Sequence, residues 1–528
     1  MNFNKKLAVA VSGAVLLMAG QVALADSATD IVDALVSKGV LTEEEGKLIT
    51  KGHTSKTSVT PVVKEKDGAF TLESANGNNS IQLTGRMHLD GRYSNVNDFD
   101  QTFGEVNDKD SASAADQFEM RRARLGVKGK FAKHFNYEVV GNLPGTATLD
   151  IAYLDYAKYN EMSVRFGKFK QPWGLEQLTS SNNIDFMERS YNDQITPGKK
   201  LGAMLFGEPK VGLTYAVSAF QMNDTEQDYR NDKMSFAGRG TLNFAELMGD
   251  KESIYHVGLA GFDKEWNVRG STSSSSSGGQ DPSATLLAFS SPGRGLSNVF
   301  RSQIGGERAD AKHVSSLSDE TSQMKSHAYG LEAIVARGPF KIQGEFSNSW
   351  HKGRYDISNA LGQTTADLKA RTWYAEALWL VTGEKYANSY KKGVFGSIKP
   401  TNNFDADGGS GWGALEAGLR VEGYDVTDAN MTHPGTNAGT DGFGTRFQGT
   451  MNCSGGDGLH QATVSDCKSG AKSYTAGLKW ILNPNVLFKL NYMHTKFDDA
   501  WAHYDVNPAV GVQIKKEDLV MFRTQYTF

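Results

Sequence analysis

Hydrophobic and polar residues alternate with a period of two in many successive runs along this chain. Residues 339–351 show the pattern clearly, with apolar side chains on one face and polar ones on the other. The apolar face holds Phe340, Ile342 and Phe346, and the polar face holds Lys341, Gln343, Glu345 and Ser347. A period of two is that of a β-strand whose two faces meet different surroundings. The sequence therefore predicts an all-β protein built from amphipathic strands.

Sixteen runs of this kind are separated by turn residues. We place them at 80–93, 116–130, 134–142, 148–158, 162–170, 199–207, 211–222, 233–244, 253–265, 325–337, 339–351, 368–381, 411–424, 472–482, 485–497 and 516–528. An even number of strands is typical of single-chain bacterial outer-membrane β-barrels, and sixteen strands leave room for an aqueous channel. The last run ends on the aromatic Phe528, and we expect the outer-membrane assembly machinery to recognise this terminal residue.

The connections between these runs alternate between long and short. The long ones include 94–115, 171–198, 266–324, 425–471 and 498–515, and the short ones include Ala132-Lys133, Gly338 and Asn483-Pro484. One connection on the short side, 382–410, is long and breaks the pattern. A sandwich of two sheets would not produce such an asymmetry, whereas a barrel with outer loops and periplasmic turns does. We therefore expect residues 79–528 to form a 16-stranded antiparallel transmembrane β-barrel.

Residues 1–25 have the pattern of a secretory signal peptide. Lys5 and Lys6 precede an apolar core at 7–18, and Ala23-Leu24-Ala25 supplies small residues for cleavage. The apolar core is shorter than the about 20 residues that a membrane-spanning helix needs. We therefore expect an exported mature chain without a helical membrane anchor.

Residues 26–78 are expected to precede the barrel as a short helical hairpin on a polar leader. Residues 27–52 have helical periodicity, and Thr42 and Glu45 are spaced as a capping box. Residues 53–78 are expected to form the leader. We interpret the segment as a periplasmic tail, with a contact for oligomerisation or for the cell wall as the alternative.

The composition is compatible with an exported barrel. The hydrophobic fraction is only 39%, which suffices where alternate wall positions alone face lipid. Loss of residues 1–25 removes two lysines and no acid, so the formal charge changes from −4 to −6, which argues against a nucleic-acid binder.

Cys453 and Cys467 lie 14 residues apart in a stretch rich in Gly, Asp and Ser, and predict a disulfide that closes a surface loop. Metal-ligand cysteine pairs are normally closer in sequence.

Basic residues occupy the polar faces of several predicted strands. In the run 116–130, the parity of the apolar residues places Arg122 and Arg124 in the lumen, whereas Arg121 is out of phase and either lies above the lipid band or marks a bulge. A charge that faces lipid at mid-depth costs about 2–4 kcal/mol, so phase constrains where an arginine points. By the same argument these residues face inward: Arg86, Arg92, Lys128, Lys130, Arg239 and Arg420.

Fixed positive charge along a water-filled pore favours anions over cations. Arginine suits this role because its planar fork can donate two hydrogen bonds to an oxyanion. The alternative is that these residues pair with luminal acids and only fill the wall; the acids concerned are Asp90, Asp150, Glu416 and Glu422. No nucleophile motif, metal-ligand spacing or phosphate-binding loop is found, so we expect neither an enzyme nor a cofactor or metal site.

Two segments of the chain resemble the phosphate-selective porin O and P family. They are Phe118-Glu-Met-Arg-Arg-Ala-Arg-Leu-Gly-Val-Lys-Gly129 and Val164-Arg-Phe-Gly-Lys-Phe-Lys-Gln-Pro-Trp-Gly-Leu-Glu-Gln-Leu-Thr-Ser-Ser181, the second continued by Phe186-Met-Glu-Arg-Ser190. The segments Thr382-Gly-Glu384 and Ile398-Lys-Pro400 and the last strand add support. The resemblance covers about 80–528 and implies a homotrimeric porin in the outer membrane of a Gram-negative bacterium. It also implies an inward-folded third loop at the constriction.

The resemblance assigns roles to individual residues. The constriction arginines fall on Arg121, Arg122 and Arg189, and the constriction aspartate falls on Asp150. The arginine of the first strand falls on Arg86. A lysine on the periplasmic side falls on Lys399, and Lys391 and Lys392 are nearby as further anion collectors. Gln177 and Ser389 stand where phosphate-specific relatives carry lysines, whereas Arg124 and Lys170 add positive charge. We therefore expect anion selectivity to persist, whereas the two departures argue against a simple transfer of phosphate specificity.

The expected function is passive diffusion of small anions, most of all inorganic phosphate, across the lipid of the outer membrane. A general porin, or one tuned to polyphosphate, sulfate or organic anions, is the first alternative. A structural or adhesion barrel is the second.

Overall fold

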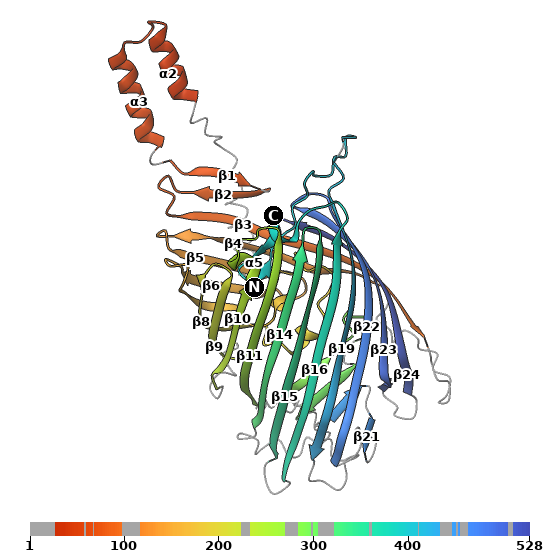
Figure 1. Ribbon diagram of the computed structural model, residues 1–528. Coiled ribbons are helices and arrows are strands. Elements are labelled where there is room, and N and C mark those ends of the chain that lie inside the picture. Colours follow the sequence, from red (N-terminus) through yellow and green to blue (C-terminus); the bar gives the residue numbers. More distant parts are fainter. Residues whose placement is uncertain are drawn as a thin grey trace. The chain divides into compact units, whose positions relative to one another are not determined.

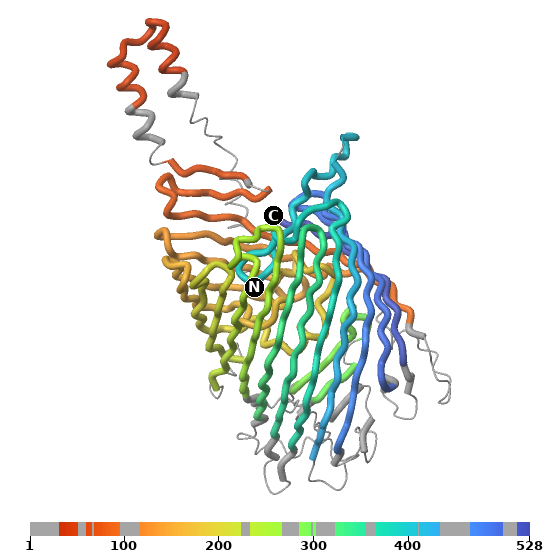
Figure 2. Tube along the Cα trace, in the orientation of Figure 1, coloured from red at the N-terminus to blue at the C-terminus, as the bar shows by residue number. Residues whose placement is uncertain are grey.

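The computed structural model describes most of the chain (Figures 1 and 2). The chain divides into two compact units. The described residues are 27–57, 60–66, 68–97, 117–222, 233–269, 284–296, 299–304, 321–357, 362–409, 411–432, 446–449, 452–454, 463–504 and 511–528. One unit comprises residues 1–84 and 127–137, and the other comprises 85–126 and 138–528. The expected signal peptide, residues 1–25, lies outside the described residues.

The first unit contains a helical hairpin of α2 (Ser27–Ser37) and α3 (Glu43–Thr57). The capping box is present, because Thr42 N donates to Glu45 Oε2 at 2.9 Å and Glu45 N donates to Thr42 Oγ1 at 3.2 Å. Gly46 lets the helices approach closely, since a Cβ there would lie 2.6 Å from Val36 Cγ2. The helical prediction for 27–52 is therefore right in kind, and the second helix continues to Thr57.

The polar leader predicted at 53–78 is wrong, because these residues contain a β-hairpin. Strands β1 (Val62–Lys66) and β2 (Ala69–Glu73) pair antiparallel, with Val62 opposite Glu73. The signal was present in the sequence: two short apolar runs flank Asp67-Gly68, a dipeptide typical of two-residue hairpin turns.

A closed ring of sixteen strands among the described residues forms the barrel, and most of its residues belong to the second unit. The strands are β3 (Ser80–Asn97), β4 (Gln117–Phe131), β5 (Phe135–Asn142), β6 (Thr148–Tyr156), β7 (Ser163–Lys170), β8 (Lys199–Lys210), β9 (Leu213–Phe220), β10 (Ser235–Asn243), β11 (Ser253–Arg269), β14 (Thr321–Arg337), β15 (Phe340–Ile357), β16 (Gly362–Leu380), β19 (Ala414–Thr432), β22 (Thr463–Ile481), β23 (Val486–Tyr504) and β24 (Gly511–Thr527). The ring closes where β24 pairs antiparallel with β3 (Figure 1), and Phe528 exchanges two backbone hydrogen bonds with Gly85. The predicted fold class is confirmed.

The two faces of the wall are those that the alternation predicts. On β15 the side chains of Phe340 and Ile342 are exposed on the outer face, whereas Lys341 and Gln343 are buried on the inner face. Several strands extend further than predicted at their loop ends; β15, for example, continues to Ile357 rather than ending at 351. Pairing there persists in residues that are polar on both faces, where the alternation that marks a strand is lost.

Several connections carry short elements of their own. They are α4 (Leu175–Leu178), η1 (Tyr191–Ile195), α5 (Phe244–Leu247), β12 (Ala284–Phe289), β13 (Phe300–Ile304), η4 (Tyr386–Ser389), β17 (Tyr390–Lys391), β18 (Val394–Phe395), β20 (Arg446–Gly449) and β21 (Asn452–Ser454). Strands β12, β13 and β20 form a separate three-stranded sheet. In the described part of the chain, none of the helices has the length and apolar character that a membrane crossing requires. Cys467 is buried and disulfide-bonded, whereas the side chain of Cys453 lies outside the described residues.

Candidate functional site

The connection 171–198 between β7 and β8, which we call the pore loop, packs inside the barrel. Its side chains Trp173, Leu175 and Met187 are almost fully buried. Tyr191 is also fully buried, and its backbone N–H donates to Glu422 of β19 at 3.0 Å. The inward-folded third loop that the family resemblance implies is thus present in this chain.

The carboxylates of the pore loop are held by basic side chains of the wall. Glu176 accepts a hydrogen bond from Arg420 of β19 at 2.8 Å. Asp185 lies 2.8 Å from Lys341 of β15 and 3.3 Å from Lys479 of β22. These contacts join the loop to strands on one side of the barrel.

Glu188 is the third carboxylate of the loop and contacts two further strands. Its side chain accepts hydrogen bonds from Arg121 of β4 at 2.8 Å and from Arg523 of β24 at 2.9 Å. Burial raises the pKa of Glu188, but the guanidinium groups of Arg121, Arg523 and Arg122 outweigh burial and hold that pKa well below its usual value. Glu188 is therefore ionised near neutral pH.

A second inward segment, which contains Phe289 and Ser290, fills part of the lumen beside the pore loop. Ser290 and Gln194 exchange hydrogen bonds at 2.8 and 2.9 Å. The ring of Phe289 lies 4.3 Å from that of Tyr424 and 6.1 Å from that of Tyr191, centroid to centroid. This aromatic packing belongs to a large buried cluster that continues to Phe300.

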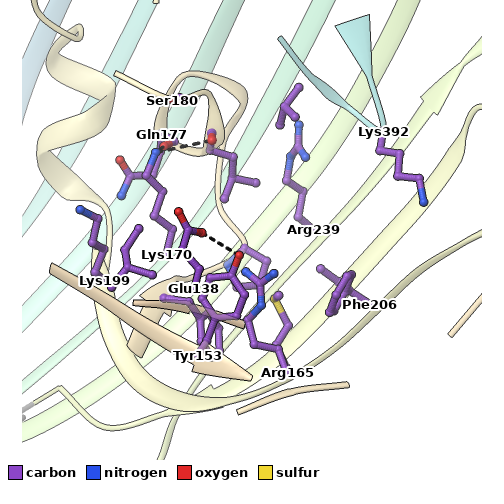
Figure 3. Close-up of a pocket in the computed structure, with 18 of the residues that line it drawn as sticks. Glu138, Tyr153, Arg165, Lys170, Gln177, Ser180, Lys199, Phe206, Arg239 and Lys392 are labelled. Atoms are coloured by element: carbon purple, nitrogen blue, oxygen red, sulfur yellow. Dashed lines mark hydrogen bonds between the residues drawn. The ribbon is translucent and has the colours of Figure 1, made fainter. Parts of the chain in front are cut away.

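A cavity of about 710 Å³ lies between the pore loop and the wall strands β3 to β10. Its described lining contains nine basic side chains and a single acidic one, Glu138. The basic residues are Arg86, Arg122, Arg124, Arg165, Lys170, Arg189, Lys199, Arg239 and Lys392. Figure 3 shows Lys170 and Lys199 at one side of this cavity and Arg239 and Lys392 at another. The cavity is therefore lined mainly by positive charge and also holds several aromatic rings.

Four of the basic residues have no carboxylate oxygen closer than 3.7 Å among the described residues. Arg86 donates instead to the hydroxyls of Ser181 at 2.9 Å and of Ser180 at 3.3 Å. Arg122 has Glu188 no nearer than 3.9 Å. The charge of both guanidinium groups is thus weakly compensated within the protein.

Lys170 and Arg189, the other two, are held by backbone carbonyls of the pore loop. Lys170 donates to the carbonyls of Gln177 and, at 3.1 Å, of Thr179. Arg189 donates to the carbonyl of Thr179 at 2.8 Å and lies 3.7 Å from Asp193. Carbonyl oxygens fix both side chains in place beside the cavity without supplying a counter-charge.

Asp150 does not contact the arginines beside which the resemblance places it. Its carboxylate lies 3.0 Å from Arg124 and also pairs with Lys199. Arg121 and Arg122 meet Glu188 instead. These two consecutive residues of β4 therefore contact the same carboxylate of the pore loop.

Other inward arginines follow the alternative prediction and pair with acids. Arg92 pairs with Glu119 at 2.9 Å. Arg239 pairs with Glu332, and Arg420 lies 2.8 Å from Glu376 as well as from Glu176. Only part of the basic residues identified from strand parity therefore face the cavity without a close counter-charge. Strand parity cannot separate the two groups.

The long connection 382–410 contributes one lysine to the cavity. Lys392 lines it, donates to Asn160 and lies 3.5 Å from Glu208. Lys391 and Lys399 are exposed and are not part of the described lining. Sequence reasoning missed Arg165, Lys199 and Glu188. The parity of Arg165 was readable in β7, because it alternates with the outward Phe166. Lys199 has the parity of the exposed Leu201, and a loop carboxylate such as Glu188 carries no periodic signal.

Comparisons with known proteins identify relatives of the chain. A family model described as phosphate-selective porin O and P matches residues 81–528. Porin O of Pseudomonas aeruginosa is 25% identical over 458 residues, which cover 83% of this chain and 87% of that protein. Among solved structures, outer-membrane expressed OmpT of Vibrio cholerae has a TM-score of 0.42 and 8% identity over 88% of this chain and 100% of that chain. OccK2 of Pseudomonas aeruginosa has a TM-score of 0.34 and 10% identity over 85% of this chain and 98% of that chain.

Proposed function

This chain belongs to the phosphate-selective porin O and P family and is a porin of a Gram-negative outer membrane, and from that premise we propose that its channel selects small anions, inorganic phosphate above all. The observation that carries the proposal is the cavity lining, with nine basic side chains and one acid in the described residues. Fixed cations in a narrow aqueous passage lower the free energy of an anion there and raise that of a cation.

The anion is bound by the four weakly compensated groups, Arg86, Arg122, Lys170 and Arg189. The arginine forks donate pairs of hydrogen bonds to oxyanion oxygens, which offset the loss of hydration as the anion enters the narrow section. The carbonyl and hydroxyl partners of Arg86, Lys170 and Arg189 in the free channel keep these three side chains oriented toward the cavity. Little reorganisation is then needed when an anion arrives.

Release depends on the paired groups that adjoin this cluster. Asp150 lies between Arg124 and Lys199 and offsets much of their charge. A channel conducts only when its sites bind strongly enough for entry and weakly enough for exit. Asp150 therefore limits the depth of the site, and Lys392, with Lys391 and Lys399 nearby in sequence, draws anions toward the periplasmic exit.

The two departures from the family pattern do not remove positive charge from the throat. Lys170, from the end of β7, donates to the carbonyl of Gln177, so an ammonium group lies beside the position where relatives carry a lysine. Ser389 is buried and donates to the carbonyl of Tyr386 at 2.9 Å, away from the cavity lining. On this basis we propose phosphate passage with a rearranged set of cations. A homotrimer, which the family resemblance implies, is part of the same proposal.

Planar bilayers with the purified protein in a KCl gradient test the proposal. We expect a reversal potential on the anion side and a reduction of the current when phosphate is titrated in. In the double variant Arg122→Ala/Arg189→Ala both effects should weaken strongly. Lys369→Gln is the matched control, because Lys369 is an exposed cation on the outer face of β16 that pairs with Asp428. Unchanged selectivity in the double variant would overturn the assignment.

A further inference from the structure

The cavity has an aromatic wall for which the passage of inorganic phosphate has no use. Tyr153 of β6, Phe169 of β7 and Phe206 of β8 all line it, together with Met204 and Val394. Figure 3 shows Tyr153, Arg165 and Phe206 together at one end of the group of side chains, and Gln177 and Lys199 at the other. A hydrated or bare phosphate ion gains nothing from contact with such a surface.

Arg165 organises this wall without adding free charge to it. Its guanidinium carbon lies 3.6 Å from the ring centroid of Tyr153 and 5.3 Å from that of Phe206. The same guanidinium donates to both carboxylate oxygens of Asp155, at 2.6 and 2.8 Å. Because both carboxylate oxygens of Asp155 pair with the guanidinium of Arg165, the charge of Arg165 is balanced. Arg165 therefore acts as a flat support for the rings rather than as an anion site.

The hydroxyl of Tyr153 donates to Glu138, the acidic residue of the lining, at 2.8 Å. This hydrogen bond fixes the ring of Tyr153, and the carboxylate of Glu138 accepts it. The aromatic wall is therefore rigid, as surfaces that recognise flat ligands usually are.

The cationic and aromatic groups line the same cavity. Arg86, Arg122, Lys170 and Arg189 belong to its lining, and so do the rings of Tyr153 and Phe206. A small organic anion inside this cavity therefore meets both kinds of surface.

The size of the cavity points the same way. Its volume of about 710 Å³ falls within the range of roughly 300–1,000 Å³ that is typical of pockets for organic ligands. Such pockets combine apolar and aromatic surface with a few placed polar groups, which is the composition found here.

We propose that the channel takes organic anions that carry an aromatic ring, with aryl phosphate monoesters as the representative class. The anionic group occupies the cluster of Arg86, Arg122, Lys170 and Arg189, and the ring lies against Phe206 and Tyr153. The inference rests on the proposed function, because the same cations must attract the anionic group. It adds a second recognition element that discriminates among phosphates.

Three anions at pH 8 test this inference in planar bilayers with the full chain: inorganic phosphate, methyl phosphate and phenyl phosphate. The two esters carry the same charged group and differ in the ring. We expect phenyl phosphate to reduce the KCl current by half at an about fivefold lower concentration than methyl phosphate, as one aromatic contact would give. In Phe206→Ala the two concentrations should become equal, and in Phe206→Tyr the preference should persist.

Phe166→Ala is the matched control, because this ring lies on the same sheet, faces outward and is 60% exposed. Phe206→Leu keeps the bulk without the ring and makes the same comparison if Phe206→Ala does not fold. Equal block by the two esters, or an unchanged preference in the ring-free variants, overturns the aromatic site while phosphate block and anion selectivity stand. Absence of phosphate block with a cation-side reversal potential overturns the proposed function itself.

Discussion

Nε of Arg121 on β4 donates a hydrogen bond of 2.8 Å to Oε1 of Glu188 in the pore loop. Arg523 on β24 reaches the same carboxylate at 2.9 Å. An arginine that the family pattern assigns to the constriction therefore serves as an anchor for the loop. The anion cavity and the loop position are linked through this one carboxylate.

Glu188→Gln should change both properties at once. Removal of one partner from a buried ion pair leaves uncompensated charge and costs about 3 kcal/mol, so the melting temperature should fall. At the same time Arg121 and Arg122 lose their nearest negative charge, and the reversal potential in a KCl gradient should shift further to the anion side. Glu161→Gln, an exposed position in the turn between β6 and β7, is the control. A stable variant with unchanged selectivity would contradict the linkage.

The anchoring of the pore loop through Glu188 should depend on pH only in the acidic range. Burial raises the pKa of Glu188, but the surrounding guanidinium groups outweigh it and hold the pKa well below its usual 4.5. A carboxylate with a lowered folded-state pKa contributes stability that is complete above its usual pKa and is lost as the pH falls through the lowered value. Thermal unfolding followed by circular dichroism should therefore be flat from about pH 8 to 5 and then decline. The stability difference between the wild type and Glu188→Gln should shrink in the same acid range; a loss already between pH 7 and 5 would point to other groups.

The fold could be predicted almost completely from the sequence, because apolar outward and polar inward residues alternate along the strands of a barrel wall. Phe340 and Lys341 were assigned correctly from parity alone. The β1–β2 hairpin was missed although Asp67-Gly68 signalled it, since the flanking apolar runs are too short to show a period. The elements inside the loops were missed as well, because residues packed on all sides show no alternation.

The site was only partly predictable for a related reason. Parity identifies which arginines face inward, but their state depends on carboxylates that arrive from distant loops. Arg86 and Arg420 look alike in the sequence, yet Arg86 meets hydroxyls and Arg420 meets Glu176 and Glu376. A contact between residues more than 200 positions apart leaves no trace in local sequence.

This distinction between weakly compensated and paired cations predicts that neutralising them has unequal effects on anion selectivity. Arg86→Gln removes a weakly compensated charge from the cavity, so the reversal potential should move toward zero and phosphate block should weaken about tenfold, the effect of one charge-assisted hydrogen bond. The double variant Arg239→Gln/Glu332→Gln replaces a closed ion pair by two neutral amide side chains. Its reversal potential should stay near that of the wild type. Equal shifts in the two variants would mean that position in the lumen matters more than pairing.

The disulfide gives a prediction that is independent of the pore. Cys467 is disulfide-bonded and does not belong to the described cavity lining. Peptide mapping without reductant should recover a fragment pair that links Cys453 to Cys467. A loop of about 15 residues contributes about 3 kcal/mol in the chain-entropy model, so Cys453→Ser should lower the melting temperature and leave conductance unchanged. A change in anion selectivity in this variant would show that the outer loop affects the pore.

The fit of the pore loop against the wall depends on a glycine. A Cβ at Gly477 of β22 would lie 2.9 Å from the ring of Phe186 in the pore loop and 2.8 Å from Nδ2 of Asn491. Because both distances are shorter than real Cβ contacts, Gly477→Ala should displace the loop at a cost of about 1–3 kcal/mol. The displaced loop should alter single-channel conductance and lower the melting temperature.

Gly240→Ala is the matched control for this change. Gly240 also lies within a wall strand, β10, and a Cβ there would have its nearest neighbour, Thr214 O, at 4.0 Å. Both variants carry the same loss of backbone freedom in the unfolded chain, so the difference between them isolates the contact with Phe186. Identical conductance in the two variants would mean that the loop position tolerates the added methyl group, and the constriction would then be set by the ion pairs of Glu176, Asp185 and Glu188 alone.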